Sequence, residues 1–237
     1  MMSTQKTYFN WSSGKDSALA LHYLLQDQNY QIKHLVTSVN THHNRVSMHG
    51  VRRELLVSQI ESIGIPFSTI ELPEEPDMEI YQKKMDDCVS LLKAKGFEHT
   101  AFGDIFLEDL RKYREDKLSK YNIKAHFPLW KRDTNELINE FIDLGFQAIV
   151  VCVQSNLLGS SFVGRMIDKD FIKELPKNVD PCGENGEFHT FCFDGPIFQS
   201  PIPFVIGEKV YKEYKDPKNE KNGIGFWFCD LLPDSQE

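Results

Sequence analysis

Six residues near the start of the chain combine the side chains that bind phosphate. Residues 12–17 read Ser-Ser-Gly-Lys-Asp-Ser and stand between an apolar-aromatic run and a helical pattern. A turn from strand to helix aims unpaired backbone N–H groups and the positive end of the helix dipole at one point, where anions bind. Gly14 lets the backbone approach a ligand, Lys15 adds a positive charge, and Asp16 requires a cation between itself and a phosphate. The loop therefore predicts a phosphate site with Mg²⁺ beside Asp16.

The hydroxyls of this loop have expected roles of their own. Ser12, Ser13 and Ser17 offer hydrogen bonds to a phosphate, and Ser17 is also expected to cap the helix. The spacing is neither G-x-x-x-x-G-K-[ST] nor G-x-G-x-x-G. A plain strand–helix turn with solvated charges is the alternative interpretation of the loop.

A second polar segment, residues 180–198, reads DPCGENGEFHTFCFDGPIF. Glycine turns flank Glu184 and Glu187, and an aromatic strand follows, so both carboxylates are expected on a loop near a sheet edge. Paired carboxylates bind a cationic group, accept a proton from ammonia or hold a metal. On spacing alone, a polar loop with two solvated acids is the simpler interpretation. His189 is a candidate for titration near neutral pH, with a structural role as the alternative.

Strands and helices alternate over the first half of the chain. The expected strands are 7–11, 32–39, 67–72 and 100–105, and the expected helices are 17–26, 51–63, 78–95 and 107–121. This alternation predicts an α/β fold in which helices cover a parallel sheet. Ligands of such sheets bind at the carboxyl ends of the strands. Residues 12–17, 38–41 and 103–104 are therefore expected to line one crevice.

The second half of the chain follows a looser pattern. A helix is expected at 135–144, a buried strand at 147–153, and a hairpin of 209–214 with 224–232 around the polar loop DPKNEKNG. We expect two domains. Residues 1–125 form a nucleotide-binding domain, and residues 126–237 form a smaller mixed α+β domain that binds the substrate.

Composition narrows the class of protein. The chain has 237 residues, of which 41% are hydrophobic and 26% charged, as in globular proteins. Its formal net charge of −8 argues against a nucleic-acid partner, because the phosphates of nucleic acids bind to basic surfaces. Five cysteines without a C-x-x-C pair argue against a zinc or dithiol site. Without a signal or membrane-spanning run, the chain is expected to be cytoplasmic and not bound to a membrane.

Three histidines follow the second expected strand. The spacing of His42, His43 and His49 fits no standard zinc pattern, so solvated loop histidines are expected there.

Both polar segments resemble motifs of known enzymes. Residues 12–17 resemble the S-G-G-K-D-S loop (PP-loop) of the N-type ATP pyrophosphatases, with Ser13 where the first glycine usually stands. If that position needs a positive φ, serine is strained there. Residues 180–198 resemble the G-E-x-G-E-[FY]-x-T…DGP signature of the diphthine–ammonia ligase-like family. Further segments that resemble this family are 48–66, 102–115, 127–130 and 161–168, so the resemblance covers nearly the whole chain and is closer to the family's bacterial members.

The resemblance implies a fold, a reaction and a set of residues. It implies a HUP fold (adenine nucleotide alpha hydrolase-like), ATP and Mg²⁺ as cofactors, and an ATP-dependent amide ligase. Such an enzyme adenylates a carboxylate, releases pyrophosphate, and then amidates the adenylate with ammonia, leaving AMP. The implied catalytic residues are Lys15, Asp16, Glu184 and Glu187. The implied ATP-binding residues are Ser12, Ser13, Gly14, Lys15, Asp16, Ser17, Ser38, Val39, Gly103 and Asp104. The implied substrate-binding residues are Arg114, Glu115, Glu184, Glu187, His189 and Thr190.

Other functions stay open at this point. A bacterial member would have no diphthine, so its carboxylate would differ and a corrinoid of cofactor salvage is one candidate. A PP-loop sulfurtransferase that thiolates tRNA would need a reactive cysteine, for which Cys182 is the candidate. A non-enzymatic ATP sensor would bind ATP without forming AMP. The expected partners are a small-molecule or protein carboxylate and ammonia, with a homodimer as a possibility.

Overall fold

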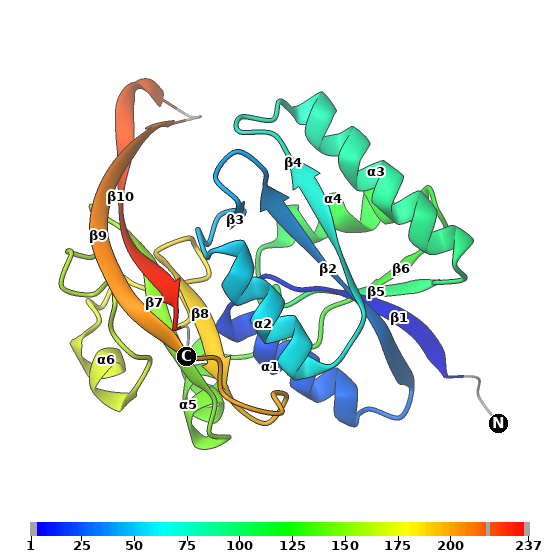
Figure 1. Cartoon of the computed structure of the whole chain (residues 1–237), viewed down its shortest axis with the longest axis horizontal. Helices are drawn as coiled ribbons and strands as arrows, with labels where there is room; N and C mark the ends of the chain where they lie inside the picture. Colours follow the sequence, from blue (N-terminus) through cyan, green and yellow to red (C-terminus); the bar gives the residue numbers. More distant parts are fainter. Residues whose placement is uncertain (1–3, 217–218, 235–237) are drawn as a thin grey trace.

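The computed structural model describes residues 4–216 and 219–234, which form two sheets and six helices (Figure 1). Sheet A contains β1 (Gln5–Asn10), β2 (Tyr30–Asn40), β3 (Arg45–Val46), β4 (Phe67–Leu72), β5 (His99–Ala101) and β6 (Lys124–His126). Sheet B contains β7 (Gln147–Gln154), β8 (Phe188–Asp194), β9 (Phe204–Asp216) and β10 (Asn219–Pro233). The helices are α1 (Lys15–Gln26), α2 (Arg53–Ile63), α3 (Met78–Ala94), α4 (Glu108–Ser119), α5 (Thr134–Asp143) and α6 (Lys169–Glu174).

Sheet A has the topology expected of a nucleotide-binding sheet. Its parallel strands lie in the order β4-β2-β1-β5-β6, and the short β3 pairs antiparallel with the end of β2. The chain moves outward from β1 to β4 and then returns to β5 on the other side of β1. Such a reversal opens a crevice at the carboxyl ends of the two central strands, where ligands of this fold class bind. The predicted α/β fold with a parallel sheet and a smaller second part is confirmed.

Helices cover both faces of sheet A (Figure 1). On one face, Tyr8, Val36 and Ile70 of the sheet belong to a core cluster with Val89 of α3 and Leu118 of α4. These side chains are all less than 9% exposed. Burial of apolar area therefore stabilises the packing of α3 and α4 on this face, by roughly 25 cal/mol per Å².

The other face of sheet A shares its core with sheet B. One cluster of buried side chains includes Phe9 of β1, Leu21 of α1, Leu56 of α2, Val151 of β7 and Phe191 of β8. All four strands of sheet B pair antiparallel in the order β8-β7-β10-β9. A core that runs through both sheets fixes the β8 edge of sheet B against the carboxyl edge of sheet A.

Local sequence explains where several elements begin and end. Helix α5 is capped by Asp133, whose carboxylate accepts hydrogen bonds from the N–H groups of Asn135 and Glu136. Helix α2 is followed by the C-cap Gly64, whose φ of 76° is the left-handed conformation that glycine adopts without strain. Strand β7 is buried from Ala148 to Val153, in keeping with the run of apolar residues in QAIVVCV.

Two sequence expectations about elements are wrong. The fourth strand was expected over 100–105, but β5 ends at Ala101, and the chain turns away where Gly103 meets the start of α1. The first helix was expected from Ser17, but α1 begins at Lys15. The short elements β3, β6 and α6 were not predicted, because two to six residues show too little periodicity.

The C-terminal hairpin is confirmed and is longer than expected, with β9 and β10 reaching 13 and 15 residues. Part of its expected loop, residues 217–218, lies outside the described residues. The expected boundary at 125/126 falls within β6, and the division into two domains stays a prediction. Within 4–216 and 219–234, no helix combines the length and apolar character needed to cross a bilayer.

Candidate active site

The loop of residues 12–17 leaves the carboxyl end of β1 and enters α1. Its second residue, Ser13, has a φ of 72°, so the position does require the left-handed conformation that the usual glycine would supply. The Ser13 carbonyl accepts hydrogen bonds from Gln59 Nε2 at 3.0 Å and from the Cys192 N–H at 2.9 Å. The Ser13 hydroxyl is buried and has no hydrogen-bond partner among the described residues. A buried hydroxyl without a partner is costly, and a ligand oxygen would satisfy it.

The first turn of α1 is capped from the other sheet. The helix N-cap is Gly14, and the Lys15 N–H donates to Thr190 Oγ1 of β8 at 3.0 Å. The expectation that Ser17 caps the helix is wrong, because Ser17 lies inside the first turn. Its hydroxyl donates to the Gly14 carbonyl at 3.0 Å and accepts from Ser12 Oγ at 3.0 Å.

Two glycines allow neighbouring segments to close on this loop. A Cβ on Gly14 would lie 2.7 Å from His49 Cε1 and 3.2 Å from the Thr190 carbonyl. A Cβ on Gly103 would lie 2.9 Å from the Ser17 nitrogen. A side chain at Gly103 would therefore clash with the backbone of α1, and a side chain at Gly14 would force the His49 ring to shift. The end of β5 therefore lies directly on the first turn of α1, as the topology predicts.

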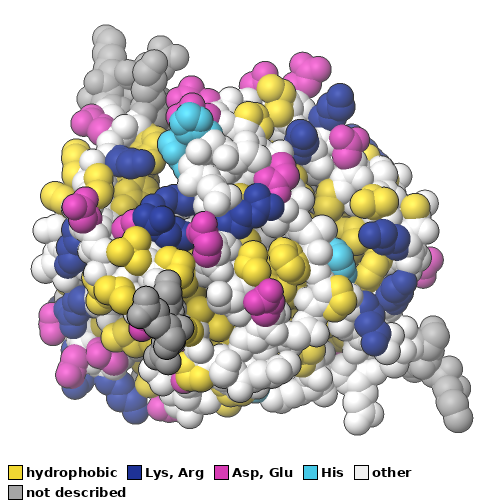
Figure 2. All heavy atoms as spheres, in the orientation of Figure 1, with side chains coloured by type: hydrophobic (Ala, Val, Ile, Leu, Met, Phe, Trp, Pro, Cys, Tyr) yellow, Lys and Arg dark blue, Asp and Glu magenta, His cyan; other side chains and the backbone are white. Residues whose placement is uncertain are grey.

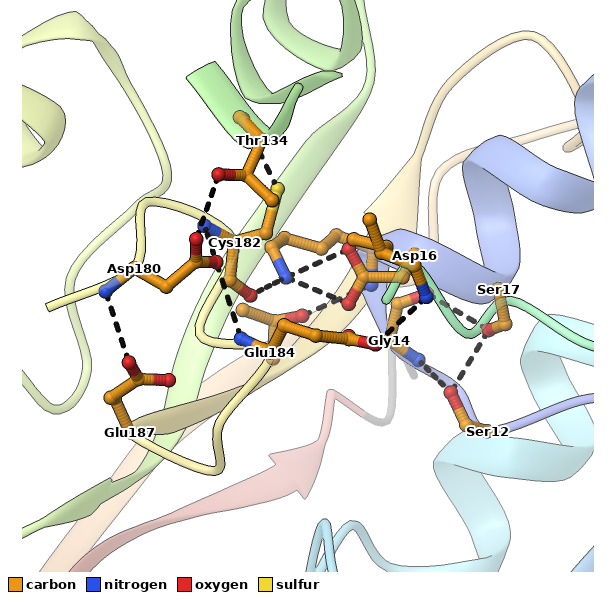
Figure 3. Close-up of polar contacts among 12 residues, drawn as sticks. Ser12, Gly14, Asp16, Ser17, Thr134, Asp180, Cys182, Glu184 and Glu187 are labelled. Carbon is orange, nitrogen blue, oxygen red and sulfur yellow. Dashed lines mark hydrogen bonds and ion pairs between the residues drawn. The ribbon is translucent and has the colours of Figure 1, made fainter. Parts of the chain in front are cut away.

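The Lys15 ammonium joins the two motifs. Its Nζ lies 2.9 and 2.8 Å from the two Asp16 carboxylate oxygens and also donates to the Cys182 carbonyl (Figure 3). The side chain is only 3% exposed. Burial by itself would lower the pKa of Lys15, but the charges around it, Asp16 foremost, raise that pKa overall. Burial raises the pKa of Asp16, against the opposing effect of Lys15.

Glu184 reaches the same cluster from the second motif. Its Oε1 accepts hydrogen bonds from the backbone N–H groups of Ile105 at 2.7 Å and Phe106 at 3.4 Å. Burial first, and then the charge of Asp16, raise the pKa of Glu184 to about 7. A carboxyl group that titrates near neutral pH is suited to exchange protons with a substrate.

The remaining acids of the second motif shape its loop. Glu187 is 2% exposed, and its oxygens accept from the N–H of Asp180 and from the N–H and Nδ2 of Asn185. Figure 3 shows it on the far side of the loop from Asp16. Asp180 accepts from the Cys182 N–H at 2.9 Å and from Thr134 Oγ1 at 2.7 Å. These contacts favour a structural role for Glu187, and its catalytic role stays a prediction.

His189 and Thr190 lie beside the loop in different ways. The His189 ring stacks on His49, with ring centroids 4.8 Å apart. Burial and the neighbouring His49 lower the pKa of His189 to about 3, so the expected titration near neutral pH is wrong. Burial lowers the pKa of His49 to about 4. Both rings are therefore neutral at physiological pH. The Thr190 hydroxyl, by contrast, accepts a hydrogen bond from the Lys15 N–H.

The other expected ATP residues lie at the same sheet edge, with their backbone or side chains engaged. The Ser38 carbonyl accepts from the Ser47 N–H at 3.0 Å, and Val39 is paired on both sides, with β3 and with β4. Asp104 forms an ion pair with Arg114, Nε to Oδ2 at 2.9 Å. Contact of Ser38 and Val39 with adenine stays a prediction.

Arg114 and Glu115 are separated by the geometry of α4. The Arg114 guanidinium lies over the Phe102 ring, 4.2 Å from its centroid, and lines a cavity of about 50 Å³ between sheet A, α3 and α4. Glu115 instead pairs with Arg111 on the exposed side of the helix, at 2.8 Å. Glu115 is therefore not brought to the Lys15 cluster, and its expected role in substrate binding stays untested.

Family models decide where this chain belongs. The model described as the diphthamide synthase N-terminal domain matches residues 5–124, and the model of the C-terminal domain of the same synthase matches residues 133–222. The chain belongs to the diphthamide synthase family.

Curated relatives carry a related name. Proteins called diphthine–ammonia ligase from Bos taurus and Homo sapiens are each 30% identical to this chain, over 54% of it and 51% of the relative. The Schizosaccharomyces pombe protein of that name is 25% identical over 67% of this chain and 26% of its own length. This member of the diphthamide synthase family thus spans about half the length of the animal relatives it matches.

Solved structures were compared as well. The U34-tRNA thiolase NcsA from Methanococcus maripaludis, with its 4Fe-4S cluster, matches with a TM-score of 0.39 and 15% identity, over 61% of this chain and 59% of that one. A score this low supports no conclusion about the present family member.

Sequence reasoning missed three groups that build the candidate site. Gln59 is fully buried and joins Trp11 Nε1 to the carbonyls of Ser13 and Cys192. His49 was expected to be a solvated loop histidine, which is wrong, because its ring packs on Gly14 and stacks on His189. The third is the carbonyl of Cys182, a backbone group that no side-chain pattern reveals.

The charges at the site fit a divalent cation. Three carboxylates, those of Asp16, Asp180 and Glu184, interact with one another or with the Lys15 ammonium. The carboxylates of this cluster therefore outnumber its cation. Oxygen-rich, net negative sites are what Mg²⁺ prefers. The unpartnered Ser13 hydroxyl and the first turn of α1 fit a phosphate beside it.

Proposed function

We propose that this protein is an ATP-dependent amide ligase. It adenylates a substrate carboxylate, releases pyrophosphate, and transfers the acyl group to ammonia with release of AMP. The observation that carries the proposal is the contact of Lys15 with both Asp16 and the Cys182 carbonyl, which makes one site of the two motifs. The family and the names of its curated relatives support the same reaction class.

Lys15 and the first turn of α1 bind the triphosphate in this proposal. Because the Lys15 ammonium is buried against Asp16, it must exchange that carboxylate for phosphate oxygens when ATP binds. Mg²⁺ held by Asp16 would supply the charge that neutralises the pyrophosphate leaving group. Ser12, Ser13 and Ser17 lie within the same loop and orient the phosphates through their hydroxyls.

Glu184 acts as the general base of the second step. Attack of ammonia on the acyl carbon forms the C–N bond and breaks the bond to AMP, and one proton must leave the nitrogen. Ionised Glu184 accepts that proton, for which a pKa of about 7 is well placed. His189 does not compete for this role, since the pKa of its ring is lowered to about 3.

The substrate is a carboxylate on a small molecule or a protein. Diphthine is the candidate that the relatives' name suggests, and a cofactor-salvage carboxylate of the corrinoid type is the candidate if the source does not make diphthamide. The loop of residues 180–187 holds Glu184 at the edge of the site and is proposed to bind the acceptor. Cytoplasmic localisation and a homodimer stay predictions.

The reaction class is tested by its products. The protein is incubated with ATP, Mg²⁺, ammonium and candidate carboxylates, and nucleotides are separated by chromatography. AMP and pyrophosphate are expected in equal amounts, and ADP with phosphate would contradict the proposal. Lys15→Met should lose activity by about 100-fold or more. Lys173→Met is the matched control, because Lys173 is 73% exposed and forms an ion pair with the equally exposed Asp170.

Sulfur transfer has less support. Cys182 is 2% exposed, and its thiol donates to the Thr134 carbonyl. Burial raises the pKa of this thiol far above its usual range, which disfavours the thiolate that sulfur transfer needs. Figure 2 shows acidic and basic side chains interspersed on the drawn face, whereas a tRNA would favour a basic one. Full activity of Cys182→Ala would remove this alternative, and ATP binding without AMP formation would favour a sensor.

A further inference from the structure

The loops that follow β2 and β4 bring two imidazoles and a carboxylate together. Because β2 and β4 are parallel neighbours, both loops leave sheet A at its carboxyl edge (Figure 1). His42 Nε2 lies 3.4 Å from Glu74 Oε1, and His43 Nε2 lies 3.7 Å from the same oxygen. The ligand atoms of all three side chains lie within 4.8 Å of one another.

Hydrogen bonds below the cluster hold the two loops in place. Asn40 Nδ2 donates to the carbonyls of Pro73 and Glu74, at 3.1 and 3.0 Å, and its Oδ1 accepts from the His43 N–H at 3.0 Å. Thr41 donates through both its N–H and its hydroxyl to the Leu72 carbonyl. Asn40 and the adjacent Thr41 thus hold the backbone on each side of the cluster, so the two loops are positioned before any ion binds.

The spacing suits a small transition-metal ion. Zn²⁺ binds imidazole nitrogen at about 2.0–2.1 Å and carboxylate oxygen at about 2.0–2.2 Å, which for a tetrahedron puts ligands roughly 3.4 Å apart. The two distances to Glu74 are 3.4 and 3.7 Å, so small rotations of the side chains complete the geometry. His42, His43 and Glu74 are 59%, 46% and 52% exposed, which leaves the outer coordination position to water.

We propose that His42, His43 and Glu74 form a binding site for a divalent transition-metal ion, with Zn²⁺ as the expected ligand. Two imidazoles with one carboxylate suit Zn²⁺, Co²⁺ or Ni²⁺, whereas Mg²⁺ prefers oxygen ligands alone. The site is therefore chemically distinct from the carboxylates around Lys15. The third histidine of this region, His49, takes no part, because its ring packs on Gly14 and bonds the Thr190 carbonyl.

A bound ion would clamp the two loops beside the nucleotide crevice. Its ligands come from the ends of β2 and β4, and β2 also carries Ser38 and Val39. The inference rests on the geometry of the loops and does not depend on the proposed ligase reaction.

Metal binding is measured on the full chain with ZnCl₂, by calorimetry in buffer that contains excess Mg²⁺. One equivalent of Zn²⁺ should bind, and His42→Ala and His43→Ala should each weaken binding by about tenfold or more. Co²⁺ in place of Zn²⁺ should give visible absorption that both variants lose. His34→Ala is the control, because this histidine lies within β2 and bonds Ser68.

Two results would overturn the inference. Zn²⁺ binding that survives in the double variant His42→Ala/His43→Ala would place the ion elsewhere. If the Zn²⁺ affinity is unchanged in both single variants, or if the parent protein binds no Zn²⁺, then Glu74 and the two imidazoles form only a surface contact. Glu74→Gln, which keeps the shape of the side chain, should weaken Zn²⁺ binding without unfolding the protein, as checked by circular dichroism.

Discussion

The Glu184 carboxylate lies in a buried, acidic environment, and its pKa is raised to about 7 by burial and by Asp16. In an unfolded chain a glutamate titrates near 4.3. The folded protein therefore binds this proton more tightly, and its stability falls as the pH rises from about 4 through about 7. The residue proposed as the base is thus a stability cost at the pH where it would act.

Glu184→Gln should remove that cost. Its amide oxygen still accepts from the Ile105 N–H. The variant is expected to exceed the parent in free energy of unfolding by about 1–2 kcal/mol at pH 8, allowing for solvent screening, and by little at pH 4. Its ligase activity should fall by about 100-fold or more. Urea unfolding at both pH values checks the prediction. An unaltered difference across pH would contradict it, and Glu98→Gln, on an exposed acid, is the control.

Ser13 is strained in its backbone conformation. A non-glycine residue with φ of 72° costs roughly 1–2 kcal/mol, and the unpartnered hydroxyl adds to that cost. Ser13→Gly should therefore raise the free energy of unfolding by about 1 kcal/mol, after the greater chain entropy of glycine is subtracted. Ser13→Ala keeps the backbone strain and removes only the hydroxyl. If that hydroxyl contacts phosphate, both variants weaken ATP binding, while only glycine relieves the backbone. Equal stability of the two variants would contradict the strain argument.

The meeting of α1 with β8 is the main link between elements at the site. Thr190 Oγ1 satisfies the Lys15 N–H, and the Cys192 N–H satisfies the Ser13 carbonyl. The edge of sheet B thus takes the place of the side-chain cap that α1 lacks. Any shift of β8 therefore moves the start of α1.

Thr190→Val should uncap α1 while keeping the shape of the side chain. We expect a loss of about 1 kcal/mol in the free energy of unfolding, together with a higher KM for ATP. Thr190→Ser keeps the oxygen and is expected to retain most of both. Unfolding and initial-rate measurements on the two variants check this, and a valine variant with unchanged KM would show that the cap does not position the loop.

The sequence predicted this fold better than it predicted the contacts between elements. Apolar periodicity and the Gly64 stop located α2, and the two polar motifs pointed to the candidate site because their residue types are chemically distinctive. The turn at Gly103 was missed, because its conformation depends on α1 rather than on neighbours in sequence. The low pKa of His189 likewise depends on burial in the folded protein and on His49, 140 positions away in the numbering, and no local pattern encodes either.

At the scale of the whole molecule, a charge cluster ties the C-terminal hairpin to sheet A. Asp230 of β10 accepts from Arg45 of β3 at 2.8 Å and from Arg52, at the start of α2, at 2.7 and 3.1 Å. Burial opposes ionisation of Asp230, but hydrogen bonds from Arg52 and Arg45 outweigh it and lower the pKa to about 2. The depressed pKa means that the cluster stabilises the fold above about pH 4, and that this stability is lost as the pH falls towards 2.

Asp230→Asn tests whether this cluster holds the two sheets together. With one acceptor oxygen and its charge removed, two guanidinium groups that are only about a third exposed lose their shared partner. We expect a loss of about 2 kcal/mol in the free energy of unfolding at pH 7, and a much smaller one at pH 2.5, where the parent is partly protonated. Asp170→Asn makes the same chemical change in an exposed ion pair and should leave the free energy of unfolding nearly unchanged at both pH values. Because β3 precedes the segment that carries His49, the Asp230→Asn variant should also bind ATP more weakly. If the loss of stability is instead equal at both pH values, packing and not charge joins the hairpin to sheet A.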